Sequence, residues 1–159
     1  MTGRRRFLVA ISVCLALLAC AAVAIAAIPK EGKYLGKTGQ DLKVRIKVNK
    51  SHNIPDKGFF IRWKAICKKK DSNGHHLTWG PDSTVNTGNL DVAGDGSFEQ
   101  SGKYNENSGS YVGHMKGGLN GKFGSPTSAT GKFHIRVRVT KNGNYVDTCK
   151  KTVSWQVSS

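Results

Sequence analysis

Residues 131–140 read Gly-Lys-Phe-His-Ile-Arg-Val-Arg-Val-Thr, and this stretch decides the fold class. Apolar and polar residues alternate along it, and the apolar set is Phe133, Ile135, Val137 and Val139. Successive side chains of a β-strand point to opposite faces, so the run predicts a strand with one face toward a core and one toward water. The face toward water carries His134, Arg136 and Arg138.

Three other runs, at residues 42–48, 59–67 and 149–157, show the same alternation. Weaker strands are expected at 84–92, 111–115 and 119–123, and a hairpin is expected from Ser97 to Tyr104. Gly, Asn, Asp, Ser and Pro separate the runs, and helical periodicity is nearly absent after residue 28. The pattern predicts an all-β domain, either an antiparallel sandwich or a meandering β-barrel of about eight strands.

The N-terminal segment is typical of an export signal. Three arginines, Arg4 to Arg6, precede an uncharged run over residues 7–28, and Ala24-Ile25-Ala26 provides a small-residue cleavage site. We therefore expect a signal peptide at 1–26, a single basic β domain at 27–159, and a secreted or extracytoplasmic location. The run over 7–28 is also long enough to span a bilayer, so an uncleaved anchor is the alternative. Arg4 to Leu8 fits the twin-arginine pattern, which leaves the export route open.

Two of the four cysteines, Cys14 and Cys20, lie in the predicted signal. The other two, Cys67 and Cys149, both fall on the apolar parity of their strands. Cysteines in an oxidising compartment usually pair, so we expect a Cys67–Cys149 disulfide inside the core. Neither cysteine has CxxC spacing, and no metal site is predicted.

Several motifs resemble those of small exported β proteins of actinobacteria. They are the stretch Gly32–Thr38, the turn Asp95-Gly96-Ser97-Phe98, the Gly121-x-Phe123 and Gly131-x-Phe133 pair, and Cys149 followed six residues later by Trp155. The resemblance spans most of the chain after the signal. It implies export, a β fold and a disulfide, and it implies no active site.

Catalytic motifs are missing from the sequence. It contains no G-x-S-x-G elbow, no H-E-x-x-H zinc motif and no phosphate-binding loop before a helix. The adjacent His75 and His76 have no carboxylate or cysteine at ligand spacing, which favours surface histidines. We therefore expect a protein that is not an enzyme and that needs no cofactor.

Charge is the strongest functional signal. The chain has 25 Lys and Arg against 10 Asp and Glu, a net charge of +15. Without Arg4, Arg5 and Arg6 the domain keeps 22 against 10, a net of +12. Such a field attracts polyanions, so an anionic envelope or extracellular polymer, or an anionic lipid surface, is the expected partner. The candidate residues for a basic sheet face are Lys43, Arg45, Lys47, Arg62, Lys64, Arg136 and Arg138.

Other interpretations remain open. The positive charges could be dispersed and serve solubility alone. A closed barrel could carry a small hydrophobic ligand, for which a lined central cavity would be the sign. A protein-binding or inhibitor module would show an exposed apolar patch around Leu77, Trp79 and Pro81. Export disfavours a nucleic-acid partner, membrane association would depend on retention of the N-terminal segment, and the oligomeric state is left open.

Overall fold

A computed structural model describes residues 27–80 and 84–159. The predicted signal segment at 1–26 lies outside the described residues. The described chain folds as β-strands without a helix. The strands are β1 Gly32–Thr38, β2 Lys43–Val48, β3 Phe59–Arg62, β4 Ala65–Lys70, β5 His76–Trp79, β6 Thr84–Asn86, β7 Ser97–Ser108, β8 Tyr111–Ser125, β9 Ser128–Lys141 and β10 Asn144–Ser158.

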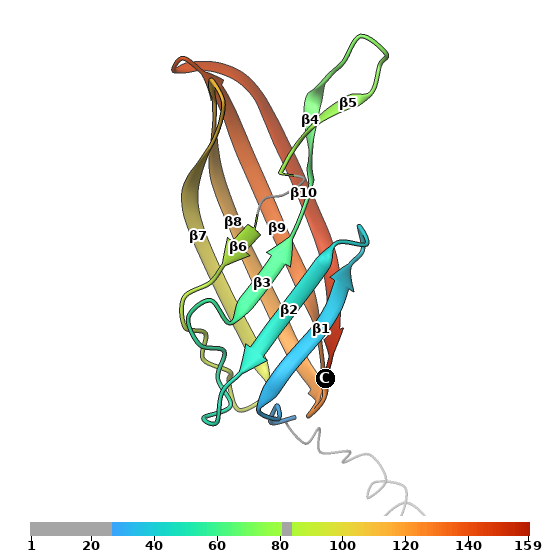
Figure 1. Ribbon diagram of the computed structural model, residues 1–159, viewed down its shortest axis with the longest axis vertical. Helices are drawn as coiled ribbons and strands as arrows, with labels where there is room; N and C mark the ends of the chain where they lie inside the picture. The colour runs from blue at the N-terminus through green and yellow to red at the C-terminus, as the bar shows by residue number, and fades with distance from the viewer. Residues whose placement is uncertain (1–26, 81–83) are drawn as a thin grey trace, which may run out of the picture.

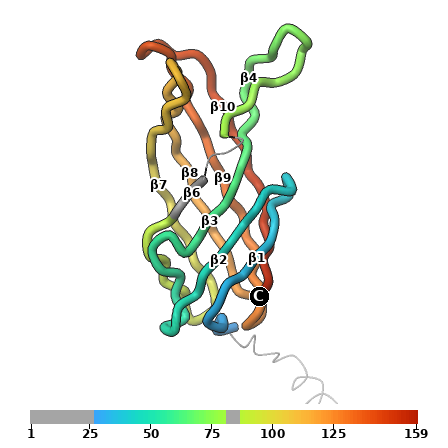
Figure 2. Tube along the Cα trace, in the orientation of Figure 1, coloured from blue at the N-terminus to red at the C-terminus, as the bar shows by residue number. Residues whose placement is uncertain are grey.

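The strands form one antiparallel sheet in the order β6-β3-β2-β1-β10-β9-β8-β7. Strand β4 pairs with β10 and with β5, and the β4–β5 hairpin projects from one end of the molecule (Figures 1 and 2). The sheet curls into a half-barrel, so that β1, β2, β3 and β6 lie in front of the long strands β7–β10 in Figure 1. The predicted all-β, antiparallel, barrel-like class is confirmed. Among the described residues no helix has the length and apolar character needed to cross a membrane.

The core lies inside the curl, where the apolar faces of the front and rear strands meet. Aromatic rings fill one end of it: Trp155 lies edge-on to Phe59, with ring centroids 5.4 Å apart, and Phe98 lies 6.0 Å from Trp155. Farther along, Trp63 packs against Phe133 at 6.1 Å. The alternation along residues 131–140 is confirmed, because its apolar set is buried and its polar set is exposed.

A disulfide joins Cys67 of β4 to Cys149 of β10, as the sequence predicts. The two residues lie directly opposite each other in the antiparallel ladder, with Cα atoms 3.7 Å apart. Both are buried, and Cys149 is fully inaccessible. The bridge ties the short β4 to the middle of β10. A buried disulfide fits a protein that works outside the reducing cytosol.

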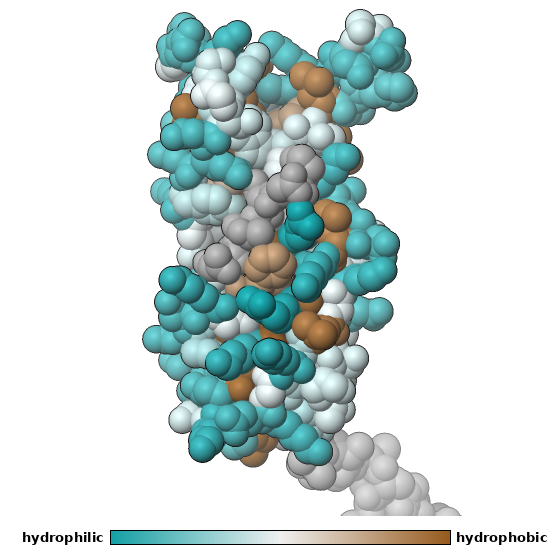
Figure 3. Space-filling model, in the orientation of Figure 1, coloured by the Kyte–Doolittle hydropathy of each residue, from teal (hydrophilic) through white to brown (hydrophobic). Residues whose placement is uncertain are grey.

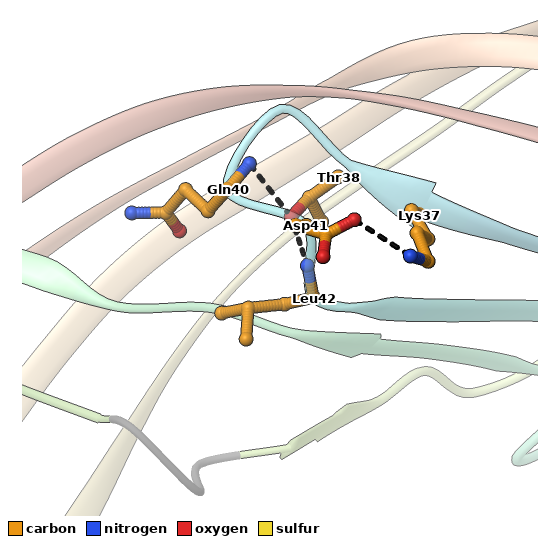
Figure 4. Close-up of polar contacts among 5 residues, drawn as sticks. All are labelled: Lys37, Thr38, Gln40, Asp41 and Leu42. Carbon is orange, nitrogen blue, oxygen red and sulfur yellow. Dashed lines mark hydrogen bonds and ion pairs between the residues drawn. The ribbon is translucent and has the colours of Figure 1, made fainter.

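The turn from β1 to β2 shapes the front of the barrel (Figure 4). The Thr38 hydroxyl accepts hydrogen bonds from the main-chain N–H groups of Gln40 and Leu42, at 3.1 and 3.2 Å. Lys37 pairs with Asp41 at 2.7 Å. The Gln40 side chain points away from the turn and bonds both main-chain groups of Lys64. Residue 64 is therefore held outside the ladder.

Some predicted strand boundaries were wrong. The expected strand at 59–67 is interrupted at residues 63–64, where Gln40 takes the main-chain bonds of Lys64, and it forms β3 and β4. The expected hairpin between Ser97 and Tyr104 is instead one long strand, β7, which turns only after Ser108. The expected strands at 111–115 and 119–123 are continuous in β8, because Gly117 and Gly118 are fully paired with both neighbouring strands. The run at 84–92 shortens to β6 and a single bridge between Ile54 and Leu90.

Candidate anion-binding face

The outer face of the long strands lacks exposed negative charge at β8, β9 and β10. Strands β8 and β9 contain no Asp or Glu. The acid of β10, Asp147, is only 5% exposed, and its carboxylate accepts hydrogen bonds from the main-chain N–H groups of Lys69 and Thr148. This face is turned away from the viewer in Figure 1.

Four cations form a line across this face, one from each of four neighbouring strands. Lys103 of β7 lies opposite Lys116 of β8, and Lys116 lies opposite Arg136 of β9. Arg136 in turn lies opposite Lys150 of β10. All four residues are exposed, and we call them the cationic row. Because neighbouring strands lie about 4.8 Å apart, the row spans roughly 15 Å.

A shallow hollow adjoins the row between β9 and β10. Four outward residues frame it as two cross-strand pairs, Arg136 with Lys150 and His134 with Thr152. Ile135 and Lys151, the residues between them, complete the lining. The hollow thus gathers three cations, an imidazole and a hydroxyl, which are groups that donate hydrogen bonds to phosphate or carboxylate oxygens.

The cationic row has no acidic partner among the described residues. Ion pairs elsewhere in the described part of the chain join Lys37 to Asp41, His75 to Asp71 and Lys122 to Asp95. Like charges directly opposite each other on a sheet repel, which lowers the stability of the empty protein. An anion seated along the row would remove this repulsion.

The sequence-predicted cations fall into two groups. Arg136 belongs to the cationic row, and Arg138 lies next along β9, 5.6 Å over the Tyr145 ring. Lys43, Arg45 and Lys47 are exposed on β2, while Arg62 lies at the end of the neighbouring β3 and Lys64 lies in the bend after it. Strands β1 and β10 separate β2 from β9. The seven residues therefore do not form one surface.

The β2 group has its own cross-strand pairs. Lys43 lies opposite Lys37 of β1, and Lys47 lies opposite Lys33. Arg45 lies 5.4 Å over the Phe60 ring, and Lys37 is already paired with Asp41. On the β1–β2 surface, therefore, Arg45 and Lys37 already contact an aromatic ring and a carboxylate. Among the described residues, the four cations of the cationic row make no such contact.

Sequence reasoning missed Lys103, Lys116 and Lys150. The signal for Lys150 was present, because the Asn142-Gly143 turn sets the β9–β10 register and brings Lys150 opposite Arg136 after one bulge. The signal for the other two was weak. Their strands β7 and β8 are rich in glycine and polar residues, so the alternation that marks a strand is interrupted there.

The other predicted features can be located as well. Leu77 is 46% exposed, but Trp79 lies against Gly113 and donates a hydrogen bond to Glu106 at 3.1 Å, and Pro81 lies outside the described residues. The face in Figure 3 is mainly hydrophilic, with its apolar atoms in separate spots. His76 is bonded to the Cys67 main-chain oxygen, and the described residues hold no group of three His, Cys, Asp or Glu that could bind a metal.

Comparison of the chain with known protein families, with curated proteins and with solved structures finds no match.

Proposed function

We propose that this protein is an exported, non-enzymatic binding protein that holds anionic polymers of the cell envelope on the cationic row. The observation that carries the proposal is the unbroken register Lys103–Lys116–Arg136–Lys150 across four strands. A linear polymer with regularly spaced phosphates or carboxylates can lie across the strands and meet one cation at each of them.

Two further observations support this choice. The hollow beside Arg136 and Lys150 provides a place where one anionic group can be held by more than one donor. The acid-free strands β8 and β9 leave no negative charge there to repel the polymer. The buried disulfide supports export, because such bridges persist outside the cytosol.

The test is co-sedimentation of the disulfide-intact protein with purified cell envelopes, before and after their anionic polymers are removed, over a series of salt concentrations. Binding should be lost on removal of the polymers and should weaken steeply with salt, because counterions are released when cations neutralise a polyanion. Vesicles of anionic lipid serve as a second arm. Binding to the vesicles but not to the polymers would contradict the proposal.

Charge variants locate the site. The triple variant Lys116→Gln, Arg136→Gln, Lys150→Gln removes three cations of the row. At roughly 1 kcal/mol per cation near an anionic surface, it should weaken binding on the order of 100-fold and flatten the salt dependence. The matched control is Lys33→Gln, Lys43→Gln, Lys47→Gln on the β1–β2 surface, which removes the same charge from another part of the sheet. Equal loss in both triples would mean that net charge alone governs binding.

A further inference from the structure

The half-barrel leaves a seam between its two edge strands. Strands β6 and β7 end the sheet, and no ladder joins them among the described residues. A cavity of about 300 Å³ lies at this seam, between β7 and the segment that follows β6. Ligand pockets in proteins begin at about this volume. The lining of the cavity shares only Ile135 with that of the hollow between β9 and β10.

One wall of the cavity is apolar. Leu119, Phe133 and Ile135 line it from β8 and β9. A glycine pair, Gly102 opposite Gly117, continues this wall toward the edge strand. A Cβ atom built on Gly102 would have no neighbour within 4 Å, so the missing side chain is part of the empty space.

The opposite side of the cavity presents polar groups that lack partners. Thr87 is only 3% exposed, and its hydroxyl has no hydrogen-bond partner among the described residues. The buried Tyr104 hydroxyl also has no hydrogen-bond partner among the residues that the structure describes. Buried polar groups are nearly always hydrogen-bonded, and an unpaired one lowers stability. Both residues line the cavity, with the Gln100 amide beside them.

The character of these groups indicates an uncharged ligand. Burial, with a contribution from the Glu106 charge, raises the pKa of Tyr104 to about 12, so its hydroxyl is protonated at neutral pH and can donate a hydrogen bond. Trp63 lies beside this hydroxyl and partly offsets the rise, although the pair falls short of hydrogen-bond geometry. Lys103 is the charged residue that lines the cavity. It belongs to the cationic row, and it is exposed on the outer face of β7.

We propose that the seam cavity binds a small uncharged molecule with an apolar body and a hydroxyl or carbonyl end. The apolar body would lie against Leu119, Phe133 and Ile135. The polar end would meet the hydroxyls of Thr87 and Tyr104, which would then gain the partners they lack. The site shares Lys103 with the cationic row, but the proposed ligand contacts come from other residues, so either proposal can fail without the other.

The experiment titrates the disulfide-intact protein with a series of straight-chain alcohols from butan-1-ol to octan-1-ol, followed by amide NMR shifts. Affinity should rise about three- to fourfold with each methylene until the cavity is full, and then stop rising. The shifts should centre on Thr87, Gln100 and Gly102. Hexanoate, which has the same chain with a charged end, should bind at least tenfold more weakly than hexan-1-ol.

Two variants separate binding from folding. Gly102→Val places a side chain in the empty space, where a Cβ meets no neighbour, so the protein should fold and lose alcohol binding. Tyr104→Phe removes a hydroxyl that has no partner among the described residues, so it should leave folding intact and weaken hexan-1-ol binding about three- to tenfold. Long-lived water at Thr87 and Tyr104 that no alcohol displaces would overturn the proposal. Equal binding by the Gly102→Val variant would overturn it as well.

Discussion

Arg136 of β9 lies directly opposite Lys150 of β10, and Lys116 lies opposite Arg136 on its other side. Each cation of this trio faces another cation across the ladder, with no acidic partner among the described residues. Folding the sheet therefore brings together charges that are far apart in the unfolded chain. The repulsion among them lowers the stability of the folded protein.

Removing one charge from the row should stabilise the empty protein. We expect Lys150→Gln and Lys116→Gln each to raise the free energy of unfolding by about 0.2–1 kcal/mol in low salt. The gain should shrink as salt is added, because exposed charges are screened. Urea unfolding at several salt concentrations measures it. Lys132→Gln is the matched control, since Lys132 lies on the same face of β9 opposite Asn120 and Ser154. A stability loss in Lys150→Gln would show that this side chain stabilises the sheet in another way.

Breaking the disulfide should change the free energy of unfolding by much more than removing one surface charge does. The bridge closes a sequence separation of 82 residues, for which the loss of chain entropy in the unfolded state gives about 4.5 kcal/mol. The double variant Cys67→Ala, Cys149→Ala should lower the free energy of unfolding by about that amount, as measured by urea unfolding. Addition of reductant should change the unfolding of the native protein and leave that of the double variant unchanged. An unaltered urea midpoint in the variant would contradict the prediction.

The alternation of apolar and polar residues along each strand predicted most of the fold. The strand at 131–140 was identified because a buried set and an exposed set separate there by a period of two. The Cys67–Cys149 bridge could be predicted because both residues share the parity of buried neighbours. The break between β3 and β4 could not be predicted, because it depends on Gln40, a residue 24 positions away in the β1–β2 turn that bonds the main chain of Lys64.

The candidate site was predicted only in part, for a related reason. Arg136 lies in a strand with clear alternation, so its outward direction could be inferred from sequence. The Asn142-Gly143 turn indicates that β10 lies beside β9, although one bulge shifts the register that brings Lys150 opposite Arg136. The neighbour on the other side, Lys116, depends on strand order, and a single sequence does not show that β9 lies beside β8 rather than beside β2. The seam cavity depends on glycine positions and on the absence of pairing between β6 and β7, neither of which alternation reveals.

Glycine at position 131 should be essential to the aromatic end of the core. A Cβ on Gly131 would collide with the Asn120 main-chain oxygen and would lie 2.7 Å from an atom of the Trp155 ring. Neither group can move freely, since one belongs to the ladder and the other is buried. Gly131→Ala should therefore lower the free energy of unfolding by about 3 kcal/mol or more, as measured by urea unfolding.

Gly102→Ala is the matched control for this prediction. It makes the same chemical change in a neighbouring part of the sheet, but its Cβ would enter open space. Alanine is less costly than glycine to order in a strand, so this variant should be as stable as the native protein or more stable by up to about 1 kcal/mol. Similar losses in both variants would show that the close approach at Gly131 is not the cause.

Tyr104 should titrate with a pKa of about 12, above its ordinary value of 10.0, because burial disfavours the phenolate and the Glu106 charge adds to the effect. A raised folded-state pKa means that the contribution to stability is fully present below pH 10 and is lost as the pH rises from 10 toward 12. Burial also raises the pKa of Tyr34. Ultraviolet titration of the phenolates should therefore show late ionisation from both residues, and Tyr104→Phe should remove the part that belongs to Tyr104. Occupation of the seam cavity by an alcohol should move this part to still higher pH, because the bound molecule accepts a hydrogen bond from the neutral hydroxyl. Late ionisation that is the same in the native protein and in the Tyr104→Phe variant would contradict the prediction and assign the high pKa to another tyrosine.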